Sequence, residues 1–137
     1  MKAFGSFATR LYLPISDIDL VVIGGAEGEE ALRALAEELR AKNIADEKQI
    51  EVIAHARIPI VKLTDKQTGL KVDICFGIDG GIKAVALIQS LVQRMPALRP
   101  LTLLLKYFLN CRLLNDTYSG THRALHCVVL LISLAVL

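Results

Sequence analysis

Three aspartates in apolar surroundings are the residues of this 137-residue chain whose type and spacing could do chemistry. Asp17 and Asp19 stand one residue apart at the start of an aliphatic run, and Asp73 lies inside "LKVDICF". An isolated ionised carboxylate is very costly to bury, and residues i and i+2 of a strand point to the same face. Asp17 and Asp19 should therefore repel each other unless a cation belongs between them.

A metal site follows if the strands that carry the aspartates are neighbours. Three carboxylates would then converge, and hard oxygen ligands of this kind suit Mg²⁺. Two such ions, roughly 3.5–4 Å apart, stabilise the attacking and leaving oxygens in phosphoryl or nucleotidyl transfer. The structural alternative is that Asp17 caps a turn, Asp19 is solvated, and Asp73 pairs with Lys62 or Lys71.

A Gly-Ser pair just before the first aspartates adds a phosphate-binding feature. Gly5 lets backbone N–H groups approach a ligand closely, and Ser6 opens a short helix that runs to about Tyr12. Free N–H groups at a helix N-terminus attract phosphate. Alone, such a pair is usually only a turn, so its significance comes from its position before the aspartate strand.

The elements that must position these residues are strands first and helices afterwards, which predicts an α+β fold. "AEGEEALRALAEELRAKN", residues 26–43, has the apolar spacing and acidic first turn of an amphipathic helix. Strands are expected at residues 2–4 and 17–23, in two β-branched runs broken by Pro59, and in an antiparallel hairpin over residues 58–76. From Gly81 onward the pattern predicts helices at residues 82–95 and 98–113 and in the apolar C-terminal stretch.

Composition narrows the class of protein without naming it. Hydrophobic residues make up 53% of the chain, which argues for an ordered domain, and a net charge of +2 is too weak to diagnose nucleic-acid binding. Three widely spaced cysteines without a CxxC pair argue against a zinc site and for a reduced intracellular setting. The last apolar stretch, "CVVLLISLAVL", is shorter than the roughly 20 residues that span a bilayer, so we expect a buried helix and no membrane contact.

At this point the motifs carry a family resemblance. "FGSFATRLYLPISDIDLVV" together with "VDICF" resembles the polymerase-beta-like nucleotidyltransferase palm of the noncanonical poly(A) RNA polymerases, the TRAMP-type or DNA polymerase sigma enzymes among the terminal nucleotidyltransferases. The likeness continues through "LTLLLKYFLNCRLLND". It implies a metal-binding catalytic triad of Asp17, Asp19 and Asp73. It also implies contacts to the incoming nucleotide from four residues, namely Gly5, Ser6, Gly81 and Lys106.

The resemblance implies an activity as well. The family adds AMP from ATP to RNA 3′ ends with Mg²⁺ or Mn²⁺, and terminal uridylyltransferase is the close alternative. A different class of alternative is a non-catalytic palm remnant that only binds a partner. The implied partners are the RNA 3′ end, ATP, a helicase and a zinc-knuckle RNA-binding protein, and the implied compartment is the nucleus.

The sequence also departs from the family pattern. The family's Ser-Tyr pair, which contacts the nucleotide, falls on Ala124 and Leu125, so the choice between ATP and UTP stays open. Residues 1–80 would be an N-terminally truncated palm and residues 81–137 the beginning of a helical domain, in a partial chain of weak or no activity. Lys106 lies in an apolar helical run, where its structural alternative is a lysine that reaches water at a helix edge. The histidines show no ligand spacing and are interpreted as structural.

Overall fold

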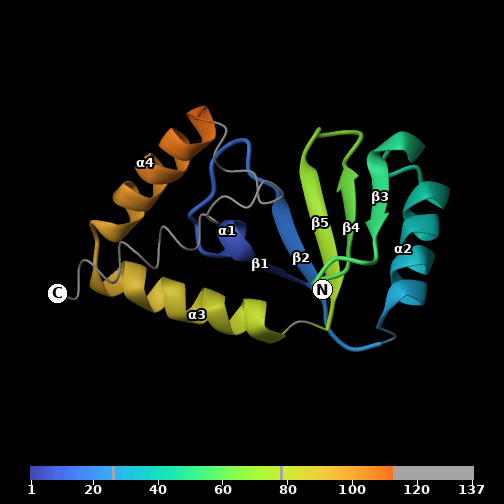
Figure 1. The fold of residues 1–137 in the computed structure, drawn as a ribbon, viewed down its shortest axis with the longest axis horizontal. Helices are drawn as coiled ribbons and strands as arrows, with labels where there is room; N and C mark the ends of the chain where they lie inside the picture. Colours follow the sequence, from blue (N-terminus) through green and yellow to red (C-terminus); the bar gives the residue numbers. More distant parts are fainter. Residues whose placement is uncertain (26, 78, 113–137) are drawn as a thin grey trace.

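A five-stranded mixed sheet forms the centre of the molecule in the computed structural model, which describes residues 1–25, 27–77 and 79–112 (Figure 1). Its strands lie in the order β1-β2-β5-β4-β3. The central pair, β2 and β5, is parallel, and every other neighbouring pair is antiparallel. The strands are β1 (Lys2–Phe4), β2 (Ile18–Val22), β3 (Ile50–Ile53), β4 (Ile60–Thr64) and β5 (Lys71–Phe76).

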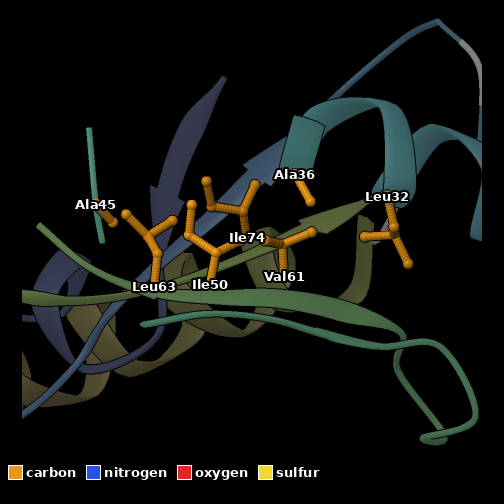
Figure 2. Close-up of a cluster of buried hydrophobic side chains, with 7 residues drawn as sticks. All are labelled: Leu32, Ala36, Ala45, Ile50, Val61, Leu63 and Ile74. Carbon is orange, nitrogen blue, oxygen red and sulfur yellow. The ribbon is translucent and has the colours of Figure 1, made fainter. Parts of the chain in front are cut away.

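One face of the sheet is apolar and packs against helix α2 (Glu29–Ala41). Because side chains alternate along a strand, Val61 and Leu63 of β4 point into this core, whereas Lys62 between them points to the other face. Figure 2 shows the buried cluster, to which α2 contributes Leu32 and Ala36. The sheet and the segments beside it contribute the other members, namely Ala45, Ile50, Val61, Leu63 and Ile74.

The position of α2 follows from its apolar stripe. Leu32 and Ala36 are one helical turn apart and are almost completely buried, at 1% and 0% exposure. Glu29 and Glu30 lie in the first turn, where acidic side chains oppose the helix dipole favourably. The helix ends at Ala41 ahead of Asn43, which adopts a positive φ of 52°.

Three helices lie on the other side of β2 from α2, as Figure 1 shows. They are the single-turn α1 (Gly5–Ala8), α3 (Asp79–Arg94) and α4 (Leu98–Cys111). No helix in the described part of the chain is long and apolar enough to cross a membrane.

Most elements lie where the sequence predicts them, with one correction. The first short helix ends at Ala8 and does not reach Tyr12. The Thr9 hydroxyl donates to the carbonyl oxygens of Gly5 and Ser6, at 3.0 and 3.1 Å, and Arg10 adopts a positive φ of 58°. These features end the helix after a single turn.

Several predictions fall on residues 113–137, outside the described residues. They are the apolar C-terminal helix, the two positions Ala124 and Leu125, and the structural interpretation of His122 and His126. The division into a palm over residues 1–80 and a helical domain over residues 81–137 stays a prediction.

Candidate active site

The strand register brings the aspartates together on the sheet face opposite α2. Asp19 of β2 and Asp73 of β5 are direct partners in the parallel pair. Asp17 precedes the first residue of β2 by one position, and its charge acts on both of the other carboxylates. Two aspartates separated by 54 positions in the sequence are therefore neighbours in the sheet, and their catalytic role stays a prediction.

The Gly-Ser pair lies directly against Asp19. In the antiparallel pair of β1 and β2, Phe4 is opposite Asp19, so Gly5 follows at the end of the strand beside the carboxylate. Gly5 has a φ of +61°, and a Cβ built there would overlap the side chain of Asp19. The backbone N–H of Ser6 acts on the Asp19 carboxylate and lowers its pKa. This site therefore requires glycine for both its conformation and its close contact.

Lys106 reaches the same cluster from α4. The residue is only 7% exposed, and its Nζ donates to the carbonyl oxygen of Leu11 at 2.8 Å. Burial lowers the pKa of Lys106, and the negative charge of Asp19 opposes that shift. The alternative of a lysine that reaches water at a helix edge is therefore wrong, because this ammonium group is buried near Asp19.

Burial and neighbouring negative charges raise the pKa values of Asp19 and Asp73. Burial raises the pKa of Asp19 from its usual 3.8 to about 6, and the charges of Asp73 and Asp17 add to the effect. Lys106 and the Ser6 N–H oppose it. Burial also raises the pKa of Asp73. A group of ionisable side chains perturbed in this way is typical of functional sites.

Lys62 holds Asp73 from the neighbouring strand. The two residues are register partners in β4 and β5, and Lys62 Nζ lies 3.1 Å from Asp73 Oδ2. The hydrogen bond and charge of Lys62 oppose the rise in the pKa of Asp73. The ion pair offered by the structural alternative thus forms, but it forms within the carboxylate cluster.

The donor set fits a hard divalent cation. Asp19 and Asp73 are register partners in partly buried surroundings, and the charge of Asp17 acts on both, so full ionisation is unfavourable, as the raised pKa values of Asp19 and Asp73 indicate. A divalent ion prefers oxygen ligands of this kind. Within residues 1–25, 27–77 and 79–112, no three acidic, histidine or cysteine side chains are already arranged around one ion position.

Gly81 has a packing role in this structure. It lies in the first turn of α3, where a Cβ would come within 2.8 Å of Cδ2 of the Phe4 ring. Phe4 immediately precedes Gly5, so the close approach of α3 fixes the strand end that carries the Gly-Ser pair. The contact of Gly81 with a nucleotide stays a prediction.

Sequence reasoning missed two parts of this site. Thr9 is 6% exposed and holds the carbonyl groups of the Gly5–Ser6 turn through its hydroxyl group. Lys62 appeared only as a pairing partner in the structural alternative. The signal for Lys62 was available, because the predicted hairpin places it on the same face as Asp73.

A comparison with protein families assigns the larger part of the chain to a known domain. Residues 1–93 match the family described as "Poly(A) RNA polymerase, mitochondrial-like, central palm domain". Poly(A) RNA polymerase protein 2 of Saccharomyces cerevisiae is 43% identical over 123 residues, which cover 88% of this chain and 21% of that protein. A Drosophila melanogaster relative, named as an inactive poly(A) RNA polymerase, is 36% identical over 118 residues that cover 85% of this chain and 29% of that protein.

Solved structures with a similar fold are matched by 93% of this chain. The polymerase core of TRAMP, described as an RNA surveillance complex, is similar with 37% identity and a TM-score of 0.79, covering 93% of this chain and 40% of that chain. The Cid1 poly(U) polymerase bound to MgGTP has 30% identity and a TM-score of 0.78, with the same coverage.

These likenesses cover a part of longer proteins. The chain spans about a fifth of the length of the first curated relatives that it matches. The fold is that of a polymerase-beta-like nucleotidyltransferase palm. With a family match over residues 1–93, the chain belongs to the noncanonical poly(A) RNA polymerase family and contains its central palm domain.

Proposed function

We propose that this chain is the palm of a template-independent nucleotidyltransferase that adds AMP from ATP to RNA 3′ ends. The observation that carries the proposal is the pairing of Asp19 with Asp73, together with the glycine turn and the buried lysine that adjoin Asp19. In the reaction, the terminal RNA hydroxyl forms a bond to the α-phosphorus of ATP, and the bond from that phosphorus to pyrophosphate breaks.

The carboxylates and the basic groups would have separate roles in this reaction. Asp17, Asp19 and Asp73 would hold Mg²⁺ or Mn²⁺. When bound, such ions neutralise the charge that develops on the attacking and leaving oxygens. Asp73 would help to activate the terminal RNA hydroxyl and to take up its proton. Lys106 and the N–H groups of the Gly5–Ser6 turn offer positive charge and hydrogen-bond donors to the triphosphate.

The test is extension of a labelled RNA with Mg²⁺ and each nucleotide in turn. We expect extension with ATP that disappears in the Asp17→Ala, Asp19→Ala double variant. Extension that survives this double substitution would remove the site assignment. The matched control is Asp65→Ala. Asp65 lies in the β4–β5 turn, where its Oδ2 accepts hydrogen bonds from the backbone N–H and the hydroxyl group of Thr68.

UTP is the second candidate substrate. The likeness to the Cid1 poly(U) polymerase favours it, at 30% identity over 93% of this chain. A preference for UTP in the same assay would assign uridylyl transfer.

Calorimetry with Mg-ATP and Mg-UTP tests the remaining alternative, a non-catalytic palm, for which the inactive Drosophila melanogaster relative is a precedent. Absence of nucleotide binding would favour that remnant.

The specific protein partners and the cellular compartment are also proposals. The likeness to the polymerase core of TRAMP supports assembly into a larger RNA-processing complex. By family resemblance, the partners would be a helicase and a zinc-knuckle RNA-binding protein in the nucleus. Co-purification from cells, followed by identification of bound proteins and imaging of the tagged chain, tests both expectations.

A further inference from the structure

A pocket with two arginines lies away from the aspartates, between the end of α1, the second half of α3 and the first turn of α4 (Figure 1). Its volume of about 390 Å³ falls within the usual range for ligand pockets, roughly 300–1,000 Å³. We call it the arginine pocket. The described residues that line it are Thr9, Arg10, Gln89, Val92, Gln93 and Arg99.

The arginine pocket has an excess of positive charge. Arg10 and Arg99 are exposed, and neither guanidinium group forms a salt bridge with a residue in the ranges 1–25, 27–77 and 79–112. No carboxylate from these ranges lines the pocket. Guanidinium groups bind carboxylates and phosphates through paired hydrogen bonds. The pocket therefore favours a ligand with negative charge.

Both arginines occupy positions that local rules disfavour. Arg10 adopts a φ of 58°, a conformation that glycine adopts without the strain that a side chain causes. Arg99 lies in the first turn of α4, where the helix dipole favours acidic side chains over basic ones. Residues that break local rules in this way are expected at functional sites. The two positions therefore favour a binding role for the arginines.

The uncharged lining residues suit a polypeptide. Gln89 and Gln93 are one helical turn apart on α3, and their amide groups can donate to and accept from a peptide backbone. The side-chain amide of Gln89 also donates to the carbonyl oxygen of Ala8 at 2.9 Å, which fixes Gln89 beside α1. Single-stranded nucleic acids usually stack their bases on aromatic rings, and none of the described lining residues is aromatic. The lining thus favours an acidic peptide over RNA.

Thr9 separates the arginine pocket from the Gly-Ser turn. Its hydroxyl group donates to the carbonyl oxygens of Gly5 and Ser6, and neither of these two residues lines the pocket. A ligand in the pocket would therefore contact the end of α1 and leave the N–H groups of the Gly-Ser turn uncovered. The pocket and the candidate nucleotide site can be occupied together.

We propose that the arginine pocket binds an acidic segment of a protein partner, whose carboxylates pair with the guanidinium groups of Arg10 and Arg99. The amides of Gln89 and Gln93 hydrogen-bond the backbone of that segment. This inference goes beyond the proposed function, because it assigns a protein-docking site that takes part in neither nucleotide binding nor transfer.

Two double variants of the full chain test the proposal. Arg10→Gln with Arg99→Gln removes both charges of the pocket. Arg40→Gln with Arg57→Gln is the matched control, because these arginines are also exposed, form no salt bridge with a described residue and do not line the pocket. Fluorescence anisotropy measures binding of a labelled oligo-glutamate peptide. An oligo-glutamine peptide of equal length and a single-stranded oligo-adenylate RNA are the comparison ligands.

We expect the pocket variant to bind the oligo-glutamate peptide about tenfold more weakly, because two charge-assisted contacts are lost. The control variant should bind this peptide like the unmodified chain, and the oligo-glutamine peptide should not bind. The thermal shift caused by Mg-ATP should be the same in all three proteins.

A single variant, Arg10→Gly, separates binding from folding. Glycine adopts the positive φ of this position without strain, so the midpoint of thermal unfolding should not fall. Binding of the oligo-glutamate peptide should nevertheless weaken, because the guanidinium group is gone. Unchanged peptide affinity in this variant would contradict a binding role for Arg10.

Three further results would overturn the proposal. The first is equal affinity of the two double variants for the oligo-glutamate peptide, and the second is absence of binding by the unmodified chain. The third is a pocket variant that loses affinity for the oligo-adenylate RNA and keeps its affinity for the peptide, which would assign the pocket to RNA. The proposed function is tested separately, because the peptide assay contains no nucleotide.

Discussion

Gly5 and Asp19 are in such close contact that any side chain at position 5 would overlap the Asp19 carboxylate. The contact follows from the pairing of β1 with β2, which places Phe4 opposite Asp19 and turns the chain immediately afterwards. The turn of the Gly-Ser pair and the position of the second aspartate are therefore one structural unit.

Gly5→Ala should destabilise the fold by about 1–3 kcal/mol and weaken Mg-ATP binding. The positive φ of +61° costs an alanine backbone strain, and the Cβ must displace Asp19. Urea unfolding and calorimetry measure the two effects. Gly24→Ala is the matched control, because Gly24 has a φ of +77° and no atom within 4 Å of a built Cβ. Equal losses in both variants would contradict the role of the Asp19 contact.

Asp19→Asn should raise the stability of the chain in EDTA and abolish its stabilisation by Mg²⁺. Asparagine keeps an oxygen for the Ser6 N–H but removes a charge that is unfavourable beside Asp73 and Asp17. The gain should be roughly 1–3 kcal/mol at pH 7, since one pKa unit corresponds to about 1.4 kcal/mol and solvent screens part of it. Thermal unfolding with and without Mg²⁺ measures this, and a less stable variant in EDTA would contradict it.

The stability difference between Asp19→Asn and the unmodified chain should depend on pH. The folded-state pKa of Asp19 is about 6 and lies above its usual 3.8, so the folded chain holds the proton more tightly between these values. In EDTA, the unmodified chain should therefore lose stability relative to the variant as the pH rises from about 4 to about 6. Above that range the difference should be constant.

Asp65 provides a control, because its contribution to stability should change with pH in the opposite direction. Hydrogen bonds from Thr68 lower the pKa of Asp65 in the β4–β5 turn. The stability that Asp65 contributes is therefore present above its unfolded pKa and is lost as the pH falls. Asp65→Asn should approach the unmodified chain at low pH, and the same slope for both variants would argue against the assignment to Asp19.

Lys106→Met should weaken Mg-ATP binding and reduce stability by about 1–3 kcal/mol, because the Leu11 carbonyl group loses its donor in a buried position. Thr102→Val is the control on the same face of α4, one turn earlier. Thr102 is 1% exposed, and its hydroxyl group has no hydrogen-bond partner among the described residues. That variant should keep nucleotide binding and should not lose stability. Equal nucleotide binding by Lys106→Met would contradict the role of the lysine.

Local rules predicted a part of the carboxylate cluster. Alternation places Asp17 and Asp19 on one face, and the hairpin of β4 and β5 places Lys62 beside Asp73. The pairing of β2 with β5, which brings Asp19 next to Asp73, is not local, and from the sequence alone it was only an assumption. The bond from Lys106 to Leu11 joins residues 95 positions apart and depends on how α4 packs, which no local pattern encodes.

The parallel pairing of β2 with β5 also sets an order of events during synthesis. A ribosome produces the strand with Asp17 and Asp19 early, but the hydrogen-bonding partner of that strand ends only at Phe76. Because such non-local pairs form slowly, the nascent chain has an unpaired β2 edge until β3, β4 and β5 have emerged. A pause in translation before Phe76 would therefore prolong exposure of an aliphatic edge that is prone to association.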